Sequence, residues 1–313
     1  MAAAAVKVPV EVDGRPLVLT NLDKVLWPET GFTKGEVIDY YTRIAPVMLP
    51  HVHDRALTVK RYPNGVEGGF FFEKNASRGT PDWVRTVDLP APGSTKNRDR
   101  IDYIVPDQLA TVVWLANLAA VEWHVPQWSV APSTTSRDTL PLPDLLVFDL
   151  DPGPPATSVQ CAQVALLLRE LAAADGLTTV VKTSGSKGLQ LYAPVTVHAS
   201  GATSAYARRL AEHLEAEHPD LVVSRMTKSL RGGKVLVDWS QNNPAKTTVA
   251  PYSLRARATQ SVSTPLHWEE VEQIASSGDE LRFLAGDVLE RVAADGDLFA
   301  ALLGDDHRAE LPS

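Results

Sequence analysis

Two aspartates close an apolar run near the middle of the chain, in the segment Leu-Leu-Val-Phe-Asp-Leu-Asp-Pro-Gly at 145–153. Side chains of a strand alternate between faces, so Asp149 and Asp151 are expected on the same face, at a strand end. Carboxylates this close repel one another unless a cation lies between them, and Mg²⁺ and Mn²⁺ prefer oxygen ligands. The pair predicts a divalent-metal site, although Asp-x-Asp by itself is more often a helix cap or a turn.

A glycine-rich loop, Thr-Ser-Gly-Ser-Lys-Gly at 183–188, connects two further apolar runs. Glycines let backbone N–H groups approach an anion closely, hydroxyls add donors, and a lysine supplies charge. This composition predicts a triphosphate-binding loop. It matches neither the Walker A pattern nor the dinucleotide-binding glycine pattern, and by itself such a loop is more often a plain hairpin connection.

A third apolar run, Lys-Val-Leu-Val-Asp-Trp at 234–239, delivers Asp238 to another strand end. Three acids on neighbouring strands can hold two metal ions about 3.5–4 Å apart, which suits phosphoryl displacement. Basic residues surround Asp238, the single acid between 225 and 257. This segregation predicts a groove for a polyanion, with a solvated basic face as the alternative.

Composition limits the class of protein. The 313 residues are 44% hydrophobic and 22% charged, with a net charge of -8 and a pI near 5.5, as in a soluble globular protein and unlike a generic nucleic-acid coat protein. Cys161 is the single cysteine, so neither an intrachain disulfide nor a Cys-x-x-Cys zinc site is expected. The apolar stretch 109–121 is too short to cross a bilayer and no secretory signal is evident, which predicts a cytoplasmic location.

The periodicity of apolar residues predicts an α+β fold. From 145 the expected order is a strand, a helix at 158–174, strands at 178–183 and 189–193, a helix at 203–217, and strand material at 221–224 and 234–238. This βαββαβ order is the split βαβ of ferredoxin-like and RRM-like folds. We expect three parts within a single domain: a mixed amino-terminal module at 1–140, a catalytic module at 141–264 and an acidic helical tail at 265–313. Within the first module we expect helices near 34–48 and 107–121, a strand at 56–61 and a basic loop around Lys96 to Arg100.

These motifs together resemble the archaeo-eukaryotic primase superfamily, and within it the polymerase domain of bacterial non-homologous end-joining ligases of the DNA ligase D type and its stand-alone relatives. The resemblance runs from about Leu17 to Leu302. It depends on four motifs, which are Phe-Asp-Leu-Asp-Pro-Gly at 148–153, Thr-Ser-Gly-Ser-Lys-Gly-Leu at 183–189, Val-Asp-Trp-Ser-Gln-Asn at 237–242 and Ala-Pro-Tyr-Ser-Leu-Arg at 250–255.

The resemblance implies a role for individual residues. The metal ligands would be Asp149, Asp151 and Asp238, with His124 and Arg231 as further active-site residues. The incoming nucleotide would be bound by Ser184, Lys187, Gln190 and Arg255. DNA would be bound by Lys24 and Lys34, which match lysines that recognise a downstream 5′-phosphate, by Phe71 and Phe72, which match aromatic residues that stack on template bases, and by Lys60 and Arg61.

One position departs from the family pattern. The family's glycine-rich motif continues Lys-Gly-Leu-His, whereas position 190 here is glutamine. Glutamine can donate a hydrogen bond to a phosphate oxygen but carries no charge. The departure predicts a change in triphosphate affinity or rate and leaves the metal site in place.

The resemblance implies a template-dependent primase-polymerase that extends primer 3′-OH ends with NTPs or dNTPs, favouring ribonucleotides, in DNA break or gap repair. Two Mn²⁺ or Mg²⁺ ions would be its cofactors. The chain shows no ligase or nuclease motif after this region, so we expect a separate DNA ligase as partner, together with Ku and gapped or broken DNA that carries a 5′-phosphate. The expected place is the bacterial cytoplasm, at the nucleoid during repair and without a membrane.

Two other functions fit part of the pattern. A haloacid-dehalogenase-type phosphatase also begins with Asp-x-Asp after an apolar strand, but it would be a doubly wound fold and would leave the basic segment 225–257 unexplained. An RRM-like nucleic-acid-binding module without catalysis would have the same strand order. The three aspartates disfavour it, because they would repel phosphate groups unless a cation lay between.

Overall fold

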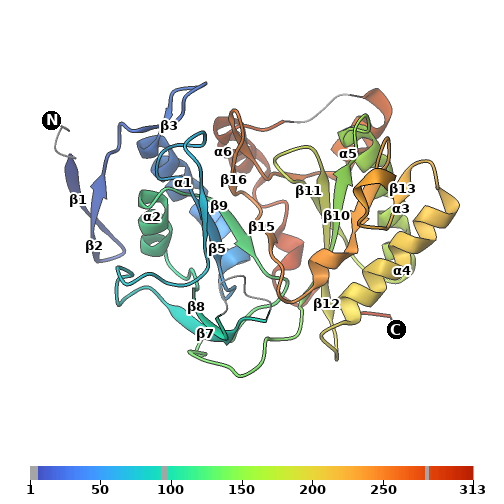
Figure 1. Ribbon diagram of the computed structural model, residues 1–313, viewed down its shortest axis with the longest axis horizontal. Coiled ribbons are helices and arrows are strands. Elements are labelled where there is room, and N and C mark those ends of the chain that lie inside the picture. The colour runs from blue at the N-terminus through green and yellow to red at the C-terminus, as the bar shows by residue number, and fades with distance from the viewer. Residues whose placement is uncertain (1–5, 93–97, 279–281, 313) are drawn as a thin grey trace.

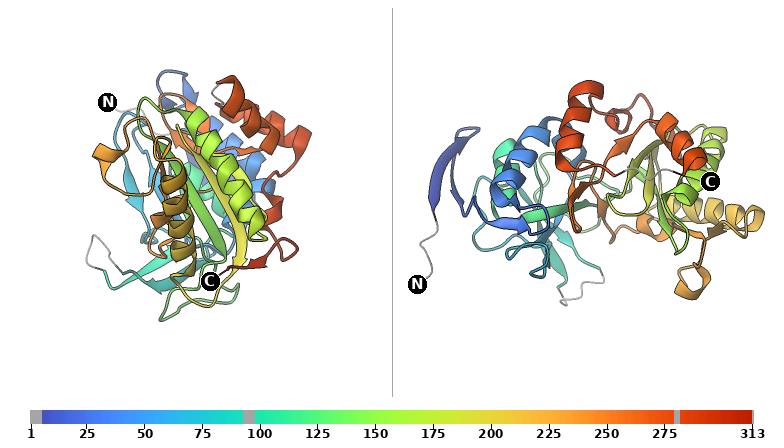
Figure 2. Two further views of the ribbon diagram at one scale, coloured as in Figure 1. Left: turned by 90° about the vertical axis from the view of Figure 1, so that its right-hand side faces the viewer. Right: turned by 90° about the horizontal axis from the view of Figure 1, so that it is seen from above.

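The computed structural model describes residues 6–92, 98–278 and 282–312 of the chain. Two modules lie side by side, the first built on strands β5 (Thr58–Arg61) and β9 (Ala120–Val125), the second on β10 (Leu145–Pro152), β11 (Val180–Thr183) and β12 (Leu189–Thr196) (Figure 1). Each module has its own cluster of buried apolar side chains. Seen from above, the molecule is elongated, and the hairpin of β1 (Lys7–Val12) and β2 (Arg15–Thr20) projects from one end (Figure 2).

The second module has the predicted βαββαβ order. Along the chain it runs β10, α3 (Ser158–Ala174), β11, β12, α4 (Ala202–Glu217) and β14 (Val235–Asp238). In space the strands are ordered β14-β10-β12-β11, and each neighbouring pair is antiparallel. Three short strands extend the sheet, namely β13 (Val222–Val223), β18 (Pro265–Leu266) and β19 (Ala309–Glu310). The predicted α+β class is confirmed, whereas the parallel sheet that the phosphatase alternative requires is not formed by these strands.

Helices α3 and α4 cover one face of this sheet (Figure 2, left). Helix α3 begins where Thr157 and Gln160 form a reciprocal capping box, which satisfies free backbone N–H groups of its first turn. From β10, the side chains of Leu146, Phe148 and Leu150 point toward the helices and are fully or almost fully buried. The alternate side chains of β10 therefore point to the opposite, helix-free face.

The helix-free face carries both the apolar contacts and the acids of β10. Leu145 and Val147 pack there in a small cluster whose other members are Tyr192, Phe299 and Leu302. Because the alternation continues, Asp149 and Asp151 also point to this face. The expectation that the two aspartates share one face of a strand end is confirmed.

The first module packs α1 (Lys34–Val52) and α2 (Leu109–Asn117) against a sheet with the order β15-β9-β5-β6, where β6 is Phe71–Glu73 and β15 is Thr248–Val249. Two further hairpins complete it, β3 (Val25–Trp27) with β4 (Phe32–Thr33) and β7 (Thr86–Pro90) with β8 (Arg100–Ile104). The helix predicted at 107–121 is wrong beyond Asn117. Ala119 adopts a positive φ of 56°, and the following residues form β9, an inner strand of the sheet.

The carboxyl-terminal part returns to both modules. Strands β16 (Leu254–Ala256) and β17 (Gln260–Val262) add Leu254 and Val262 to the core of the first module. After β18 come α5 (Trp268–Ser277), α6 (Ala285–Asp295) and the short 3-10 helix η3 (Ala300–Leu302), so the predicted helical tail begins with a strand. Of the predicted basic loop, Lys96 lies outside the described residues. In the ranges that are described, no helix is long and apolar enough to cross a membrane.

Asn242 completes the hydrogen bonding of β10 where β14 has ended. The β14 partners of β10 begin at Asp149, so the backbone of Val147 has no partner on that strand. The buried side chain of Asn242, in the 3-10 helix η2 (Trp239–Asn242), accepts a bond from Val147 N at 3.0 Å and donates one to Val147 O at 2.7 Å. Its amide thus takes the place of a strand residue beside β10.

Replacing Asn242 with alanine should leave these two backbone groups of Val147 buried without partners. We expect Asn242→Ala to lower the free energy of unfolding by about 2–4 kcal/mol, since each unsatisfied buried group costs roughly 1–3 kcal/mol. Urea denaturation followed by circular dichroism measures this change. Asn243→Ala, at the exposed neighbouring position, is the matched control and should change stability by less than about 1 kcal/mol. Equal effects of the two substitutions would contradict the assignment.

Candidate active site

Four polar side chains form one row across the helix-free face of the second module's sheet. The strand register pairs neighbours, from β11 through β12 and β10 to β14, in the order Lys182, Gln190, Asp149, Asp238. Nζ of Lys182 donates to Oε1 of Gln190 at 2.5 Å, and Nε2 of Gln190 donates to Oδ1 of Asp149 at 2.9 Å. Lys182 is fully buried and also donates to Oγ of Ser263 at 2.7 Å. The row places a chain of oriented hydrogen bonds behind Asp149.

The aspartates at the end of this row interact strongly. Burial and the charge of Asp151 raise the pKa of Asp149 to about 7, against the hydrogen bond from Gln190, which lowers it. Burial and the charge of Asp238 likewise raise the pKa of Asp151. A raised pKa means that the negative charges are unfavourable where they stand, and a cation placed among them would relieve this repulsion.

The donor set fits a hard divalent cation, because all three side chains offer carboxylate oxygens and repel one another. Asp238 is turned toward protein donors: its Oδ1 accepts from Ser240 N at 3.0 Å and its Oδ2 accepts from Gln241 Nε2 at 2.8 Å. Within the described residues, no three acidic, histidine or cysteine side chains already converge on one point. The two carboxylate oxygens of Asp238 thus already accept hydrogen bonds from Ser240 and Gln241.

The glycine-rich loop lies directly against this row because its glycines lack side chains. A Cβ atom on Gly188 would lie 2.1 Å from the carbonyl oxygen of Leu150, which precedes Asp151 in β10. Gly185 has a φ of +66°, and a Cβ atom there would lie 2.6 Å from Cγ of Arg255. Neither position accepts another residue without displacing its neighbours.

Three of the predicted nucleotide-binding residues come together at this loop. The hydroxyl of Ser184 accepts from Gly188 N at 3.2 Å, which shapes the turn, and the backbone oxygen of Ser184 accepts from Nη1 of Arg255 at 2.5 Å. Lys187 is exposed at the tip of the loop. Gln190 is placed differently, because its buried amide is bound to Asp149 and Lys182 rather than turned toward the loop.

Arg231 lies beside the aspartates, at the end of the 3-10 helix η1 (Lys228–Leu230). Its charge lowers the pKa of Asp151, and its Nη2 donates to the backbone oxygen of Met226 at 2.7 Å. Gly153 permits this approach, since a Cβ atom there would lie 1.9 Å from the backbone oxygen of Arg231. The Asp-Pro-Gly part of the motif therefore holds the Arg231 segment close to the strand that carries the acids.

His124 lies in a polar cluster of the first module, on the face of β9 opposite to the buried Trp123. Its Nε2 is 3.1 Å from Oε2 of Glu122. Burial lowers the pKa of His124, whereas the hydrogen bond with Glu122 raises it. Nζ of Lys60 and Nε of Arg255 each lie 3.4 Å from the same Oε2 of Glu122. The structure thus brings His124, Lys60 and Arg255 to one carboxylate.

Phe70, Phe71 and Phe72 are about half exposed, with exposed fractions of 51%, 45% and 52%. Lys60 Nζ lies 4.2 Å from the ring centre of Phe70, and the Arg61 guanidinium lies 5.1 Å from that of Phe71. Such exposure excludes a core strand as the explanation of these aromatic residues. Exposed rings beside cations are suited to stacking with nucleobases.

Lys24 and Lys34 come together on the first module. Nζ of Lys34 donates to the backbone oxygen of Thr20 at 2.5 Å, and Nζ of Lys24 donates to that of Pro63 at 2.5 Å. Burial, followed by the charges of Lys24 and Arg61, lowers the pKa of Lys34 to about 8. A group of cations that repel one another is a favourable place for a phosphate dianion.

Three residues of the site were not identified from the sequence. Glu122 lies two residues before His124, and Lys182 directly precedes the motif at 183–189, but neither an isolated glutamate nor an isolated lysine in a strand reveals its partners. Phe70 precedes the two phenylalanines that were assigned to DNA. The run of three phenylalanines was a usable signal, because alternation places the first and third on one face.

Comparison with known proteins identifies the family of the chain. The family model described as "LigD, primase-polymerase domain" matches residues 33–299. The chain is 46% identical over 293 residues to a multifunctional non-homologous end joining DNA repair protein LigD of Mycobacterium tuberculosis and 32% identical over 282 residues to a bifunctional LigD of Bacillus subtilis, covering 92% and 90% of this chain. It spans 37% and 43% of the length of these relatives.

A solved structure extends the similarity to three dimensions. The polymerase domain of Mycobacterium tuberculosis ligase D, in complex with DNA, superposes with a TM-score of 0.85 at 43% identity, covering 92% of this chain and 98% of that one. The fold and the site define a DNA-directed nucleotidyltransferase of the metal-dependent kind. The chain belongs to the LigD primase-polymerase domain family. The predicted recognition, fold and enzyme class are confirmed, and the individual site residues stay predictions.

Asp149→Asn tests the metal assignment without changing the shape of the side chain. We expect this variant to lose Mn²⁺ binding, measured by electron paramagnetic resonance titration, and to lose primer extension. Its thermal stability without metal should be unchanged or higher, because one of the mutually repelling charges is gone. Asp175→Asn is the control, since Asp175 accepts a hydrogen bond from Tyr206 at the end of α3, and it should bind Mn²⁺ normally. An unaltered Mn²⁺ titration of Asp149→Asn would refute the assignment.

Proposed function

We propose that this chain extends primer 3′-OH ends on a DNA template, with a preference for ribonucleotides, at gaps and breaks that carry a downstream 5′-phosphate. The observation that carries the proposal is the position of Asp149, Asp151 and Asp238 next to the loop of Ser184, to which Arg255 of β16 is bound. Carboxylates for metal ions and donors for a triphosphate are the two parts that nucleotidyl transfer requires.

In this proposal Asp149, Asp151 and Asp238 hold two Mn²⁺ or Mg²⁺ ions. Such ions lower the pKa of an attacking hydroxyl and neutralise charge on the phosphates. The loop N–H groups bind the triphosphate together with the side chains of Ser184, Lys187 and Arg255. Gln190 orients Asp149 from behind, because its amide is held by Lys182 on the other side.

His124 and Arg231 border the same site in this proposal. Burial lowers the pKa of His124, and its imidazole acts in this proposal as a hydrogen-bonding group toward the primer or nucleotide. Arg231 lies beside Asp151 and supplies positive charge to the same region. The two residues thus complete the site from opposite modules.

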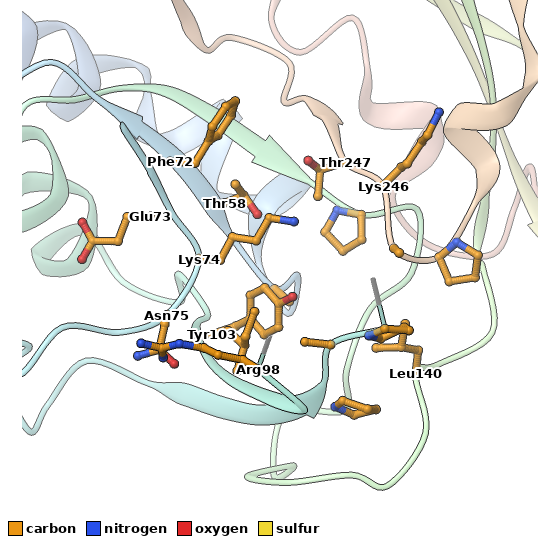
Figure 3. Close-up of a pocket in the computed structure, with 18 of the residues that line it drawn as sticks. Thr58, Phe72, Glu73, Lys74, Asn75, Arg98, Tyr103, Leu140, Lys246 and Thr247 are labelled. Carbon is orange, nitrogen blue, oxygen red and sulfur yellow. The ribbon is translucent and has the colours of Figure 1, made fainter. Parts of the chain in front are cut away.

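A cavity of about 990 Å³ lies between the two modules, next to Phe72. Figure 3 shows Lys74 reaching into it, between Tyr103 and the segment that carries Lys246 and Thr247. Burial lowers the pKa of Lys74. A space of this size with aromatic and cationic walls suits unpaired nucleotides, so we assign the cavity to the template strand.

The relatives in Mycobacterium tuberculosis and Bacillus subtilis are named as non-homologous end joining proteins. We propose the same pathway for this chain, with a DNA ligase and Ku as its partners, at the nucleoid in the bacterial cytoplasm. The 5′-phosphate would bind at Lys24 and Lys34, with Lys60 and Arg61 along the DNA. Phe71 and Phe72 would stack on template bases.

Incubation with labelled gapped DNA, Mn²⁺ and each nucleotide tests the proposal. We expect templated extension of the primer, faster with NTPs than with dNTPs, on DNA that carries the downstream 5′-phosphate. Absence of extension with every nucleotide would refute the function. Phosphate release from NTPs without extension would indicate a hydrolase instead.

The phosphate preference should depend on pH through Lys34. Its pKa of about 8 means that Lys34 is cationic below that pH and neutral above it. Phosphate binding favours the cation, so the tighter binding of 5′-phosphate over 5′-OH gapped DNA should be largest below pH 8 and should decline above it. Fluorescence anisotropy of both DNAs from pH 6.5 to 9.5 measures this.

The double substitution Lys24→Ala, Lys34→Ala should erase the phosphate preference at every pH while leaving extension on an open template intact. Lys7→Ala, Arg43→Ala removes two exposed cations elsewhere and serves as a charge-matched control. A phosphate preference that persists in the first double variant would show that the 5′-phosphate binds at another place.

A further inference from the structure

Glu122 is a buried carboxylate whose two oxygens have different interaction partners. Oε1 accepts from the backbone N–H of Ala256 at 3.1 Å and from the hydroxyl of Tyr62 at 3.4 Å. Oε2 faces Nε2 of His124 at 3.1 Å and the cationic nitrogens of Lys60 and Arg255, each at 3.4 Å. The contact of Oε1 with Ala256 thus holds β16 to the first module. Oε2 lies close to His124, Lys60 and Arg255, which are residues of the candidate site.

The surroundings of Glu122 keep it ionised. Despite burial, the hydrogen bond from His124 and the charges of Arg255 and Lys60 hold the pKa of Glu122 well below its usual range. The side chain of Glu122 is 2% exposed, so these interactions are little screened by water. One permanent negative charge therefore lies between two permanent positive charges.

Through Arg255 this carboxylate reaches the nucleotide-binding loop. Nη1 of Arg255 donates to the backbone oxygen of Ser184, while Nε faces Glu122 at 3.4 Å without hydrogen-bond geometry and has no other partner among the described residues. The guanidinium is therefore set between a loop of the second module and an acid of the first. The contacts of Oε2 thus place a buried acid among the cations that the proposed function uses to attract phosphate.

We infer that Glu122 is a positioning residue for nucleotidyl transfer, which acts through Arg255, His124 and Lys60 to fix the cations of the first module against the triphosphate loop. This inference rests on the proposed function. An acid in a phosphate-binding site weakens the attraction of the site for the bound triphosphate. The same acid holds the neighbouring cations in one geometry, which favours the reaction. The carboxylate thus favours rate over binding strength.

Glu122→Gln separates the two kinds of contact. A glutamine can keep the Oε1 acceptor for Ala256 and Tyr62, but its NH₂ group then faces Lys60 and Arg255, with which it forms no favourable contact. We expect kcat for NTP incorporation to fall about tenfold or more, since small misplacements in an active site have effects of this size. The KM for NTP should stay within about threefold or decrease, because two cations have lost their competing acid. Glu122→Asp, which keeps the charge on a shorter side chain, should recover part of kcat.

Asp297→Asn is the matched control. Asp297 is also a partly buried acid, bound to His51 at 2.8 Å and to the hydroxyl of Tyr252 at 2.7 Å, but outside the site. This variant should lose thermal stability and keep kcat per folded molecule. If Glu122→Gln also lost stability and kept kcat, Glu122 would be structural only and the inference would be overturned.

A double-mutant cycle with Arg255→Gln tests the route of the effect. If Glu122 acts mainly through Arg255, its substitution should change kcat by less than about threefold in the Arg255→Gln background. Full additivity would overturn the route through Arg255. This cycle remains informative if Glu122→Gln alone is poorly folded, because the double variant removes the buried charge together with its partner.

The pKa of His124, measured by nuclear magnetic resonance, gives a readout that does not depend on activity. Glu122 on β9 raises this pKa, whereas burial, Arg255 on β16 and Lys60 on β5 lower it, and the ring of Phe72 on β6 is uncharged. Glu122→Gln should therefore lower the pKa of His124, and Asp297→Asn should leave it unchanged. An unchanged value in Glu122→Gln would overturn the coupling. An unmodified protein that does not extend primers would instead refute the proposed function, whatever this pKa does.

Discussion

The repulsion between three carboxylates on the helix-free face of one sheet is the constraint on which the rest of the site depends. Burial and the charges of neighbouring aspartates raise the pKa of Asp149 and of Asp151. Neighbouring groups reduce this repulsion between the carboxylates. They are the amide donor of Gln190 and the positive charges of Arg231 and Arg255. The glycines at 153, 185 and 188 let the segments that bring these groups approach one another within contact distance. A metal ion bound between the aspartates would neutralise the negative charge that these groups compensate only in part.

Residues of both modules form the site. The second module contributes the acids and the glycine-rich loop, whereas the cations around Glu122 belong to the first. Arg255 joins them: it comes from β16, whose core contacts are with the first module, and it bonds to Ser184 of the second. Nucleic acid bound between the modules would therefore contact residues of both. Phe283, which packs against the cores of both modules, and the hydrogen bond from Arg255 to Ser184 hold the two modules together.

Strand alternation and helix periodicity were sufficient to predict the βαββαβ order, the shared face of Asp149 and Asp151 and the position of Asp238 at a strand end, because these features depend on local pattern. The end of α2 was not predictable in this way. Residues 118–121 are apolar like the helix before them, and the choice of strand β9 is made by pairing with β5, which is distant in sequence. The same limit applies to Lys182 and Glu122. The burial and the partners of these two residues depend on the register of three or four strands together. A local sequence pattern does not determine that register.

Gln190 shows how a departure from the family pattern can preserve a physical role. Its amide has a fixed polarity, since Oε1 accepts from Lys182 and Nε2 donates to Asp149. A neutral imidazole could fill the same place with one nitrogen accepting and the other donating, but its donor and acceptor would change on protonation. An amide does not titrate. Glutamine therefore keeps the direction of the hydrogen-bond chain behind the metal-binding aspartate at any pH, and what it gives up is a charge that, at this buried position, would lie next to Lys182 rather than next to a phosphate.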